Sequence, residues 1–415
     1  MSLPDTAERE TAALPRWLSI VGIGEDGVDG LTATARGLIG AAEIVFGGRR
    51  HLGLAASLIR GAARPWPSPF DDAADEVLRH RGRQVCVLAS GDPFHYGIGA
   101  VLAQHIDPRE MIVLPAPSAF SLAAARLGWS LPHTTLLSAH GRSLDLLRPH
   151  LQPGTRILAL TSDGAAPIAL ARMLAEPGFG ASRLTVLEAL GGPRERIRTT
   201  TAADFNFGTV QALNIVAIEA KAAPEARVIT RSAGLADNLF EHDGQITKRE
   251  VRAVTLSSLA PRRGELLWDI GAGAGSVAIE WLLSDPTFMR AVAIEERTDR
   301  AARIRRNAAA LGVPHLQIVE GTAPAALTEL TVPDAIFVGG GADASVLDAA
   351  SRALRAGGRL TVNAVTLETE ALLLARHAAL GGELTRITIA RSQPIGEKIG
   401  WRSAMPITQW LWTKP

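Results

Sequence analysis

The sequence of 415 residues is 47% hydrophobic and 20% charged, which is ordinary for a globular protein of two or three domains. A formal net charge of +1 gives no electrostatic reason to expect nucleic acid as the main partner. The single cysteine, Cys86, excludes an internal disulfide and a cysteine zinc cluster, and the ten histidines lack paired-ligand spacing, so we expect no metal site.

Residues 1–15 are predicted to form a loose polar tail without the apolar segment of a signal peptide. No run of 18 or more apolar residues occurs, so no membrane-spanning helix is expected. We therefore expect a cytoplasmic protein.

A short apolar strand at residues 17–21 leads into a glycine loop at residues 22–30. The pattern GxGxxG occurs there literally, which raises a nicotinamide-dependent oxidoreductase as an alternative. In that fingerprint the third glycine lies inside the helix that follows. Here the helix is predicted to begin near Thr32, which can cap residues 33–42. The loop is therefore too long for the dinucleotide fingerprint.

Strands and helices then alternate as far as about residue 220, which predicts a layered α/β structure. The predicted strands are residues 44–46, 85–90, 112–114, 135–138, 157–160, 184–188 and 214–219. Residues 221–226 are polar and include a proline, so we place the main domain boundary near residue 225. The expected domains are residues 16–225 and 226–415.

The second domain is organised around an apolar strand at residues 266–270, which breaks into a turn with three glycines and continues as a helix. Glycines allow a ligand to approach the backbone closely, and the start of the helix presents unpaired N–H groups there. The next strand ends at Glu295, where a carboxylate can accept both ribose hydroxyls of a bound nucleoside. Strands at residues 316–319, 334–338 and 359–363 complete an open, mostly parallel sheet.

These features resemble the Rossmann-like S-adenosylmethionine-dependent methyltransferases. The resemblance implies a cofactor site formed by Gly271, Ala272, Gly273, Ala274, Gly275, Glu295, Gly321, Thr322 and Ala323. For NAD, the third glycine of this turn comes one residue too early. Residues 247–252 and the loop at residues 339–341 further resemble the decarboxylating C15-methyltransferases of cobalamin biosynthesis, which implies that Thr247 also contacts the cofactor. A loop of three glycines cannot stack on a base, so methylation of nucleic acid is disfavoured.

Motifs of the first domain resemble the tetrapyrrole methylase family, namely residues 22–32, 90–97 and 115–119. Residues 47–51 and 138–142 resemble the C5-methylating branch of cobalamin biosynthesis. The family fold implies two α/β lobes with S-adenosylmethionine in the cleft between them. By resemblance, the cofactor is bound by Gly24, Gly91, Asp92, Pro93, Ser118 and Ala119, and by main chain near Leu160 and Ala217.

Together the halves resemble a fusion of the two enzyme types. The resemblance implies methylation of precorrin-6Y at C5 and C15 with loss of carbon dioxide from the ring-C acetate, giving precorrin-8X, with one S-adenosylmethionine site per domain. A methyl sulfonium is already activated, so no catalytic triad or metal is needed and no catalytic residue is assigned.

The candidate partners of the substrate carboxylates are Arg49, Arg50, Arg142, Lys248, Arg249 and Arg252. The last three, taken singly, also fit a solvated helix face. A homo-oligomer is expected, and an RNA or other small-molecule methyltransferase stays the alternative.

Overall fold

The computed structural model describes residues 16–67 and 72–415, so the predicted tail at residues 1–15 lies outside the described residues. The chain forms two compact units. The first runs to Arg142 and resumes from Pro153 to Ala226, and the second comprises Ser143–Gln152 and Arg227–Pro415. Every described helix is too short or too polar to span a lipid bilayer.

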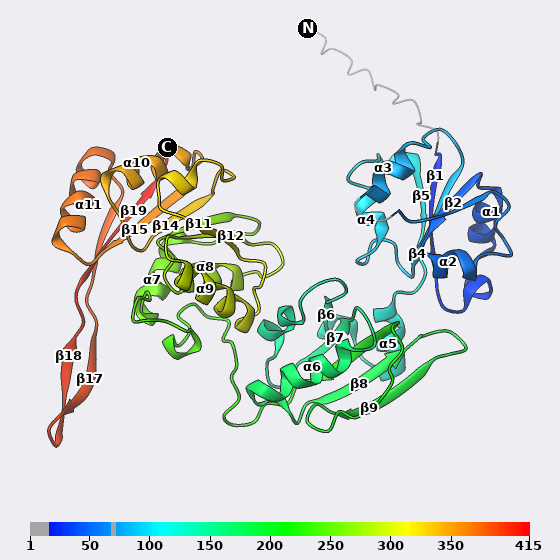
Figure 1. The fold of residues 1–415 in the computed structure, drawn as a ribbon, viewed down its shortest axis with the longest axis horizontal. Coiled ribbons are helices and arrows are strands. Elements are labelled where there is room, and N and C mark those ends of the chain that lie inside the picture. The colour runs from blue at the N-terminus through cyan, green and yellow to red at the C-terminus, as the bar shows by residue number, and fades with distance from the viewer. Residues whose placement is uncertain (1–15, 68–71) are drawn as a thin grey trace, which may run out of the picture. The chain divides into compact units, whose positions relative to one another are not determined.

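The first unit begins with a parallel sheet in the order β3-β2-β4-β1-β5 (Figure 1). Its strands are β1 (Leu18–Ile23), β2 (Ile44–Gly47), β3 (Ala62–Pro65), β4 (Val85–Ser90) and β5 (Met111–Leu114). Its helices are α1 (Ala33–Ala41), α2 (Arg49–Leu54), α3 (Ala73–Leu78), α4 (Ile98–Leu102) and α5 (Ala119–Leu127). Helix α1 covers one face through the buried Ile39, and α3 and α4 cover the other through Val77 and Leu102.

The first glycine loop ends where the sequence predicts. Thr32 caps α1, because its Oγ1 accepts a hydrogen bond from the Ala35 N–H at 3.2 Å. A short 3-10 helix (Gly27–Gly30) fills the loop before the cap. The third glycine of the GxGxxG pattern therefore lies outside the helix, as predicted, and the loop lacks the dinucleotide geometry.

The second sheet of this unit has the order β6-β7-β10-β8-β9. Its strands are β6 (Thr135–Ser138), β7 (Arg156–Leu160), β8 (Arg183–Glu188), β9 (Arg196–Thr201) and β10 (Asn214–Glu219), with α6 at Ala166–Leu174. β6 runs parallel to β7, and the other three pairs are antiparallel. Strand β9 was not predicted, since its arginines and threonines offer no apolar run.

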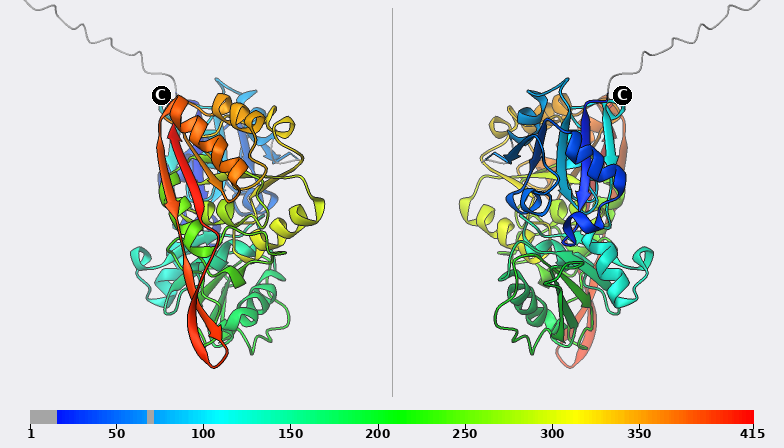
Figure 2. Two further views of the ribbon diagram at one scale, coloured as in Figure 1. Left: turned by 90° about the vertical axis from the view of Figure 1, so that its left-hand side faces the viewer. Right: turned by 90° about the vertical axis from the view of Figure 1, so that its right-hand side faces the viewer.

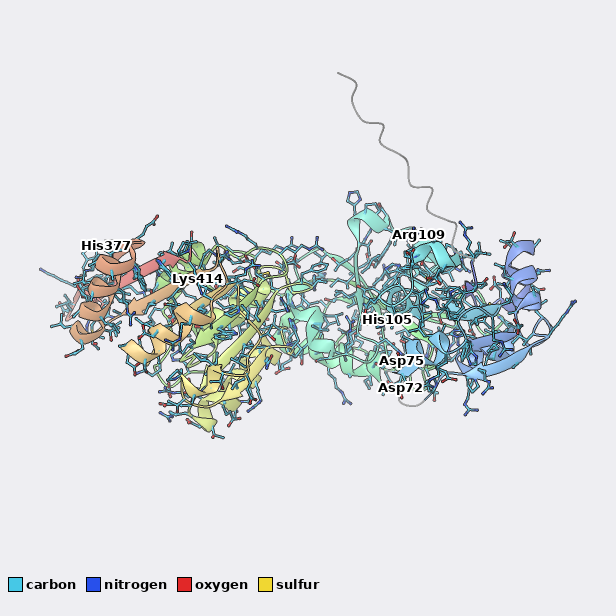
Figure 3. All side chains as sticks on the ribbon, turned by 90° about the horizontal axis from the view of Figure 1, so that it is seen from above. Asp72, Asp75, His105, Arg109, His377 and Lys414 are labelled. Carbon is cyan, nitrogen blue, oxygen red and sulfur yellow. The ribbon has the colours of Figure 1, made fainter. Side chains whose placement is uncertain are left out.

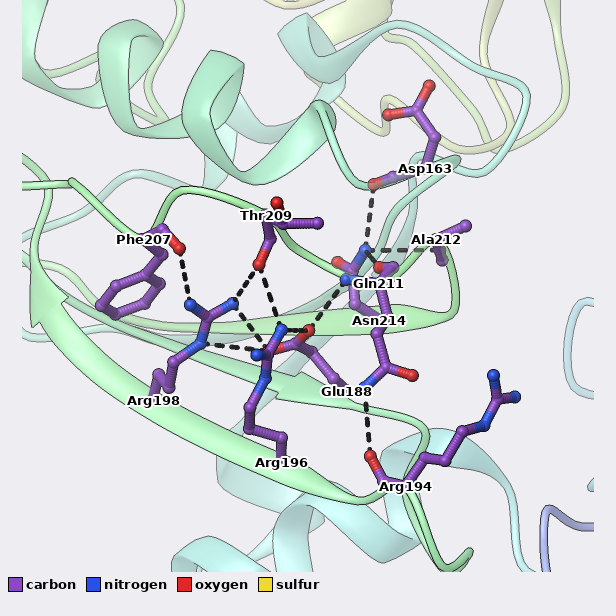
Figure 4. Close-up of polar contacts among 10 residues, drawn as sticks. All are labelled: Asp163, Glu188, Arg194, Arg196, Arg198, Phe207, Thr209, Gln211, Ala212 and Asn214. Atoms are coloured by element: carbon purple, nitrogen blue, oxygen red, sulfur yellow. Dashed lines mark hydrogen bonds and ion pairs between the residues drawn. The ribbon is translucent and has the colours of Figure 1, made fainter.

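A buried ion cluster holds β9 and the following loop against this sheet (Figure 4). The Glu188 carboxylate is fully buried, and it accepts hydrogen bonds from Arg196 at 2.6 Å and Arg198 at 2.9 Å. The backbone N–H of Gln211 donates to the same carboxylate at 2.8 Å. These donors compensate the buried charge, so we interpret the cluster as structural.

The second unit contains a seven-stranded sheet in the order β13-β12-β11-β14-β15-β19-β16, in which the first five strands are parallel. The strands are β11 (Leu266–Ile270), β12 (Arg290–Glu295), β13 (Gln317–Glu320), β14 (Ala335–Val338), β15 (Arg359–Ala364), β16 (Glu383–Ile387) and β19 (Ile407–Thr413). The helices are α7 (Arg249–Leu259), α8 (Ser276–Leu283), α9 (Thr298–Ala310), α10 (Ala344–Ala353) and α11 (Leu367–Leu380).

Two cores sandwich this sheet. Helices α7, α8 and α9 pack on one face, and α10 and α11 pack on the other. Alternate residues along β11 divide between the two, with Leu267 in the first core and Trp268 in the second. Lys414, labelled in Figure 3, donates to the carbonyls of Arg352 at 2.9 Å and Leu354 at 2.6 Å, which ties the last strand to the end of α10. The predicted α/β class and open, mostly parallel sheet are confirmed.

A two-stranded arm interrupts the connection between β16 and β19. It consists of β17 (Ala390–Ile395) and β18 (Lys398–Ser403), and it projects away from the sheet (Figures 1 and 2). The sequence carries no pattern that predicts this arm. Ile399 and Trp401 are 78% and 77% exposed on the arm.

Candidate functional site

The glycine turn between β11 and α8 closes against the loop after β14. Gly271, Gly273 and Gly275 all have positive φ, where side chains are disfavoured. A Cβ on Gly271 would lie 2.5 Å from the Gly340 carbonyl oxygen. Only glycine allows the two loops to approach this closely.

The third glycine serves packing. A Cβ on Gly275 would lie 2.7 Å from Cγ2 of Ile304 on α9, and Ala274 is 1% exposed. The Ala274 carbonyl accepts a hydrogen bond from Asn307 at 2.9 Å. Gly275 and Ala274 therefore join the turn to α9 and do not line the cavity beside it. The cofactor contacts expected of these two residues stay predictions.

Glu295 is anchored at the end of β12 beside the turn. Its Oε2 accepts from the Gly273 N–H at 2.8 Å and its Oε1 from the Arg297 N–H at 3.1 Å, and the residue is 3% exposed. Each carboxylate oxygen keeps a further lone pair for a ligand. The arrangement suits acceptance of two vicinal hydroxyls.

Asp269, at the end of β11, is buried at 1% exposure, and its Oδ2 accepts from the Ala278 N–H at 3.0 Å. Burial raises the pKa of this carboxyl to about 7, and the neighbouring charge of Glu295 acts in the same direction. It can therefore exchange a proton near neutral pH.

These elements enclose a cavity of about 530 Å³ at the carboxyl edge of the sheet. Among the predicted site residues, it is lined by Thr247, Lys248, Gly271, Ala272, Gly273, Glu295, Gly321, Thr322 and Ala323. The size, the glycines and the anchored carboxylate fit a nucleoside-bearing cofactor such as S-adenosylmethionine.

The cavity is also lined by residues that are not among the predicted site residues. They include Gln245, Arg300, Asn363, Arg391 and Met405. Arg300 lies in the first turn of α9, shortly after Glu295, a position that could have been found from the strand–helix pattern. Arg391 and Met405 belong to the base of the arm, for which the sequence carries no comparable signal.

The three basic residues at the start of α7 have different surroundings. Lys248 is exposed and lines the cavity, whereas Arg249 is exposed outside it. Arg252 is fully buried; its guanidinium donates to Glu280, to Asp237 at 3.2 Å, and to the carbonyls of Thr247 and Leu235. The prediction that Arg252 binds a substrate carboxylate is wrong, because its donors are occupied inside the protein.

In the first unit, the Gly91–Pro93 loop meets the start of α5. A Cβ on Gly91 would lie 2.9 Å from the Ser118 Cα, and its φ is +55°. Ser118 caps α5 by accepting from the Ser121 N–H at 3.2 Å, and Asp92 accepts from the Phe94 N–H at 2.8 Å. The structure thus brings two of the predicted cofactor segments together at the carboxyl ends of β4 and β5.

The remaining predicted cofactor residues of this unit lie on two strands and directly after a third. Gly24 follows β1, and Leu160 and Ala217 lie on the paired strands β7 and β10. Ala217 is 1% exposed and shares a core cluster with Ala119 and Leu160. Ligand contacts at these positions stay predictions.

The basic residues of the first unit are only partly available. Arg50 is paired with Glu25 and donates to Ser90 Oγ at 2.7 Å, whereas Arg49 and Arg142 are exposed. Burial, together with the charge of Arg50, lowers the pKa of His51 to about 4. His51 is therefore neutral at pH 7 and adds no positive charge for a substrate.

Among the described residues, no group of three His, Cys, Asp or Glu side chains could hold a metal ion.

Comparison with known proteins covers both units. A family model described as "Tetrapyrrole (Corrin/Porphyrin) Methylases" matches residues 18–206, and one described as "Precorrin methyltransferase domain" matches residues 238–414. A relative from Sinorhizobium sp, named precorrin-6Y C(5,15)-methyltransferase (decarboxylating), is 59% identical over 413 residues, which are 99% of this chain and 100% of the relative.

Two shorter relatives each match part of the chain. A Salmonella typhimurium protein named cobalt-precorrin-7 C(5)-methyltransferase is 29% identical over 48% of this chain and 98% of its own. A Saccharolobus solfataricus protein named "Probable cobalt-precorrin-6B C(15)-methyltransferase (decarboxylating)" is 35% identical over 38% of this chain and 84% of its own. Since the Sinorhizobium relative is 59% identical and aligns with 99% of this chain, the chain belongs to the precorrin-6Y C(5,15)-methyltransferase (decarboxylating) family.

Proposed function

We propose that this chain methylates precorrin-6Y at C5 and C15 and removes carbon dioxide from the ring-C acetate, giving precorrin-8X. Residues 16–225 carry the C5 reaction, and residues 226–415 carry the C15 reaction and the decarboxylation. The observation that carries this proposal is the glycine-lined cavity with the anchored Glu295, in a chain that matches a two-reaction relative along its whole length. Shorter relatives named for each single reaction support the division.

The methyltransferase family implies S-adenosylmethionine as the methyl donor, and we propose two sites per chain. In the second unit, Glu295 accepts the ribose hydroxyls, Gly271 and Gly273 admit the methionine part, and the Gly321, Thr322 and Ala323 backbone faces the adenine. In the first unit, the Gly91–Pro93 loop and Ser118 hold the donor.

When bound, S-adenosylmethionine supplies an activated methyl group. The protein must therefore mainly align the acceptor carbon with that methyl and exclude water. Lys248 at the cavity, and Arg49, Arg142 and Arg249 on exposed surfaces, are candidates to hold the carboxylates of the macrocycle.

We further propose that the protein acts in the cytoplasm as a homo-oligomer. The exposed apolar side chains on the arm support association, because apolar groups of this size are normally covered. Light scattering after size-exclusion chromatography would give the mass; a monomeric mass at micromolar concentration would contradict the oligomer.

The cofactor count can be tested by isothermal calorimetry with S-adenosylmethionine. We expect two sites in the wild-type chain. Glu295→Gln should weaken only one of them, by about 10- to 100-fold, because a charge-assisted hydrogen bond becomes a neutral one. Glu320→Gln is the matched control, because Glu320 lies opposite Glu295 in the sheet register but is exposed and does not line the cavity; it should bind as the wild type does.

A wild-type chain with one site, or none, would contradict the two-site proposal. The reaction itself is tested by mass spectrometry after incubation with precorrin-6Y, where two methyl additions and one loss of carbon dioxide are expected.

A further inference from the structure

The base of the arm forms one side of the cavity in the second unit. The loops at the carboxyl edge of the sheet provide the glycines and carboxylates assigned above to S-adenosylmethionine. The arm base adds Ile387, Ile389, Arg391, Ala404, Met405 and Ile407. None of these residues has a role in the proposed cofactor contacts, so this side of the cavity is available for the methyl acceptor.

The chemistry of this wall is apolar with one cation. Met405 is 72% exposed, although a methionine adapts readily to a flat apolar surface and is normally covered. Ile389 lines the cavity beside it, and Arg391 brings the only charge among the six arm residues. An apolar surface edged by a guanidinium matches an acceptor with a broad conjugated face and carboxylates around its rim.

Arg391 is held in place while most of its donors stay free for a ligand. Its Nη2 donates to Glu250 in the first turn of α7, and the two side chains are 48% and 44% exposed. A guanidinium has five N–H donors, so a second carboxylate can also be bound. An exposed pair of this kind is also weak enough to rearrange when a ligand arrives.

A second cation borders the same cavity. Lys248 is the residue directly before α7, two positions from Glu250, and it also lines the cavity. Glu250 therefore links the arm to the segment that presents Lys248. With Arg300 in the first turn of α9, the cavity therefore carries cations from three segments that are far apart in the sequence.

We propose that Arg391 binds a rim carboxylate of the tetrapyrrole in the C15 reaction, with Met405 and Ile389 against the face of the macrocycle. This inference rests on the proposed function. The carboxylate in question is not the acetate that is lost, because a cation paired to that acetate would stabilise its charge and oppose decarboxylation.

The test uses the full chain and follows carbon dioxide release while the concentration of precorrin-6Y is varied. Arg391→Ala should raise KM for the tetrapyrrole about tenfold and leave kcat within about twofold, since one partly exposed charge-assisted contact is lost. Arg391→Lys keeps the charge but not the forked guanidinium, so its KM should lie between those of the wild type and Arg391→Ala. S-adenosylmethionine affinity should be unchanged.

The chain offers a matched control. Arg402 lies directly opposite Arg391 in the β17–β18 register but is not part of the cavity lining. Arg402→Ala should therefore behave as the wild type. Thermal unfolding of each variant verifies that the fold is kept.

The outcomes separate the two proposals. A wild-type chain that releases no carbon dioxide contradicts the proposed function. A wild-type chain that does so, with Arg391→Ala showing an unchanged KM, overturns the role of Arg391. That role is also overturned if Arg391→Ala and Arg402→Ala raise KM equally, or if Arg391→Ala alters the ratio of carbon dioxide released to methyl transferred.

Discussion

The buried position of Arg252 makes a strong prediction about stability. Arg252→Met keeps an apolar side chain of similar length but removes the cation that neutralises Glu280. The Glu280 carboxylate, which also accepts from the N–H groups of Gly234 at 2.6 Å and Leu235 at 2.9 Å, would remain buried and unpaired by charge. Removing one partner of a buried ion pair leaves the other charge uncompensated and lowers the free energy of unfolding by about 3–5 kcal/mol.

The loss should be visible in chemical denaturation of the full chain followed by tryptophan fluorescence, because five of the eight tryptophans lie after residue 227. For a unit of this size, each kcal/mol lowers the unfolding midpoint by about 2–4 °C in a thermal scan. Arg249→Met is the matched control on the same helix. Because Arg249 is exposed, its replacement should change the unfolding free energy by less than about 0.5 kcal/mol.

A double variant tests the cause. Arg252→Met with Glu280→Gln removes both charges, so it should recover part of the loss seen in Arg252→Met alone. If Arg252→Met unfolds like the wild type and instead raises KM for the tetrapyrrole, the side chain is a surface clamp in solution. That result would refute the reasoning from burial.

Two other changes test the surroundings of the glycine turn. Gly275→Ala should cost roughly 2–5 kcal/mol of stability, because it adds left-handed backbone strain and a clash with Ile304, and denaturation of the variant measures it. Asp269 has a pKa raised by burial from 3.8 to about 7, so the folded chain retains a proton that the unfolded chain has lost. The contribution of Asp269 to the free energy of unfolding is therefore lost as pH rises from about 4 to about 7, by up to about 4 kcal/mol. Asp269→Asn should remove this pH dependence, which denaturation at pH 5 and pH 8 measures. If the variant keeps the pH dependence of the wild type, other groups cause it.

Much of the second unit could be predicted because its local signals agree with its packing. The apolar run at Leu266–Ile270, the glycines and the carboxylate at the end of β12 each follow from the geometry of a parallel sheet. The separate tasks of the three glycines could not be predicted. Gly271 faces a loop and Gly275 faces a helix, and only the tertiary structure determines which neighbour each one meets.

The arm was missed for a related reason. Its strands contain charged, polar and apolar residues on an exposed ribbon, so no alternation between buried and solvent faces marks them. Arg391 gains its place in the cavity through pairing with a distant helix residue, Glu250, which is 141 positions away in the sequence. Contacts of this range leave no local pattern.

Arg252 did leave a signal. The buried positions of α7 include Val251, Thr255, Leu256 and Leu259, and Arg252 falls on the same stripe at helical spacing. A positive charge alone predicts an exposed side chain, but a cation on an apolar stripe must be paired inside the protein.

The burial of Arg252 and the exposure of Lys248 are parts of one arrangement. The guanidinium of Arg252 is closed to ligands, but it donates to the Thr247 carbonyl, and Thr247 precedes the exposed Lys248 at the cavity. One buried cation thus fixes the backbone that presents the next cation to the solvent side. Mutation of Arg252 should therefore weaken substrate binding only through loss of structure, whereas mutation of Lys248 should weaken it with the fold intact; that contrast separates a residue that supports the site from one that contacts its ligand.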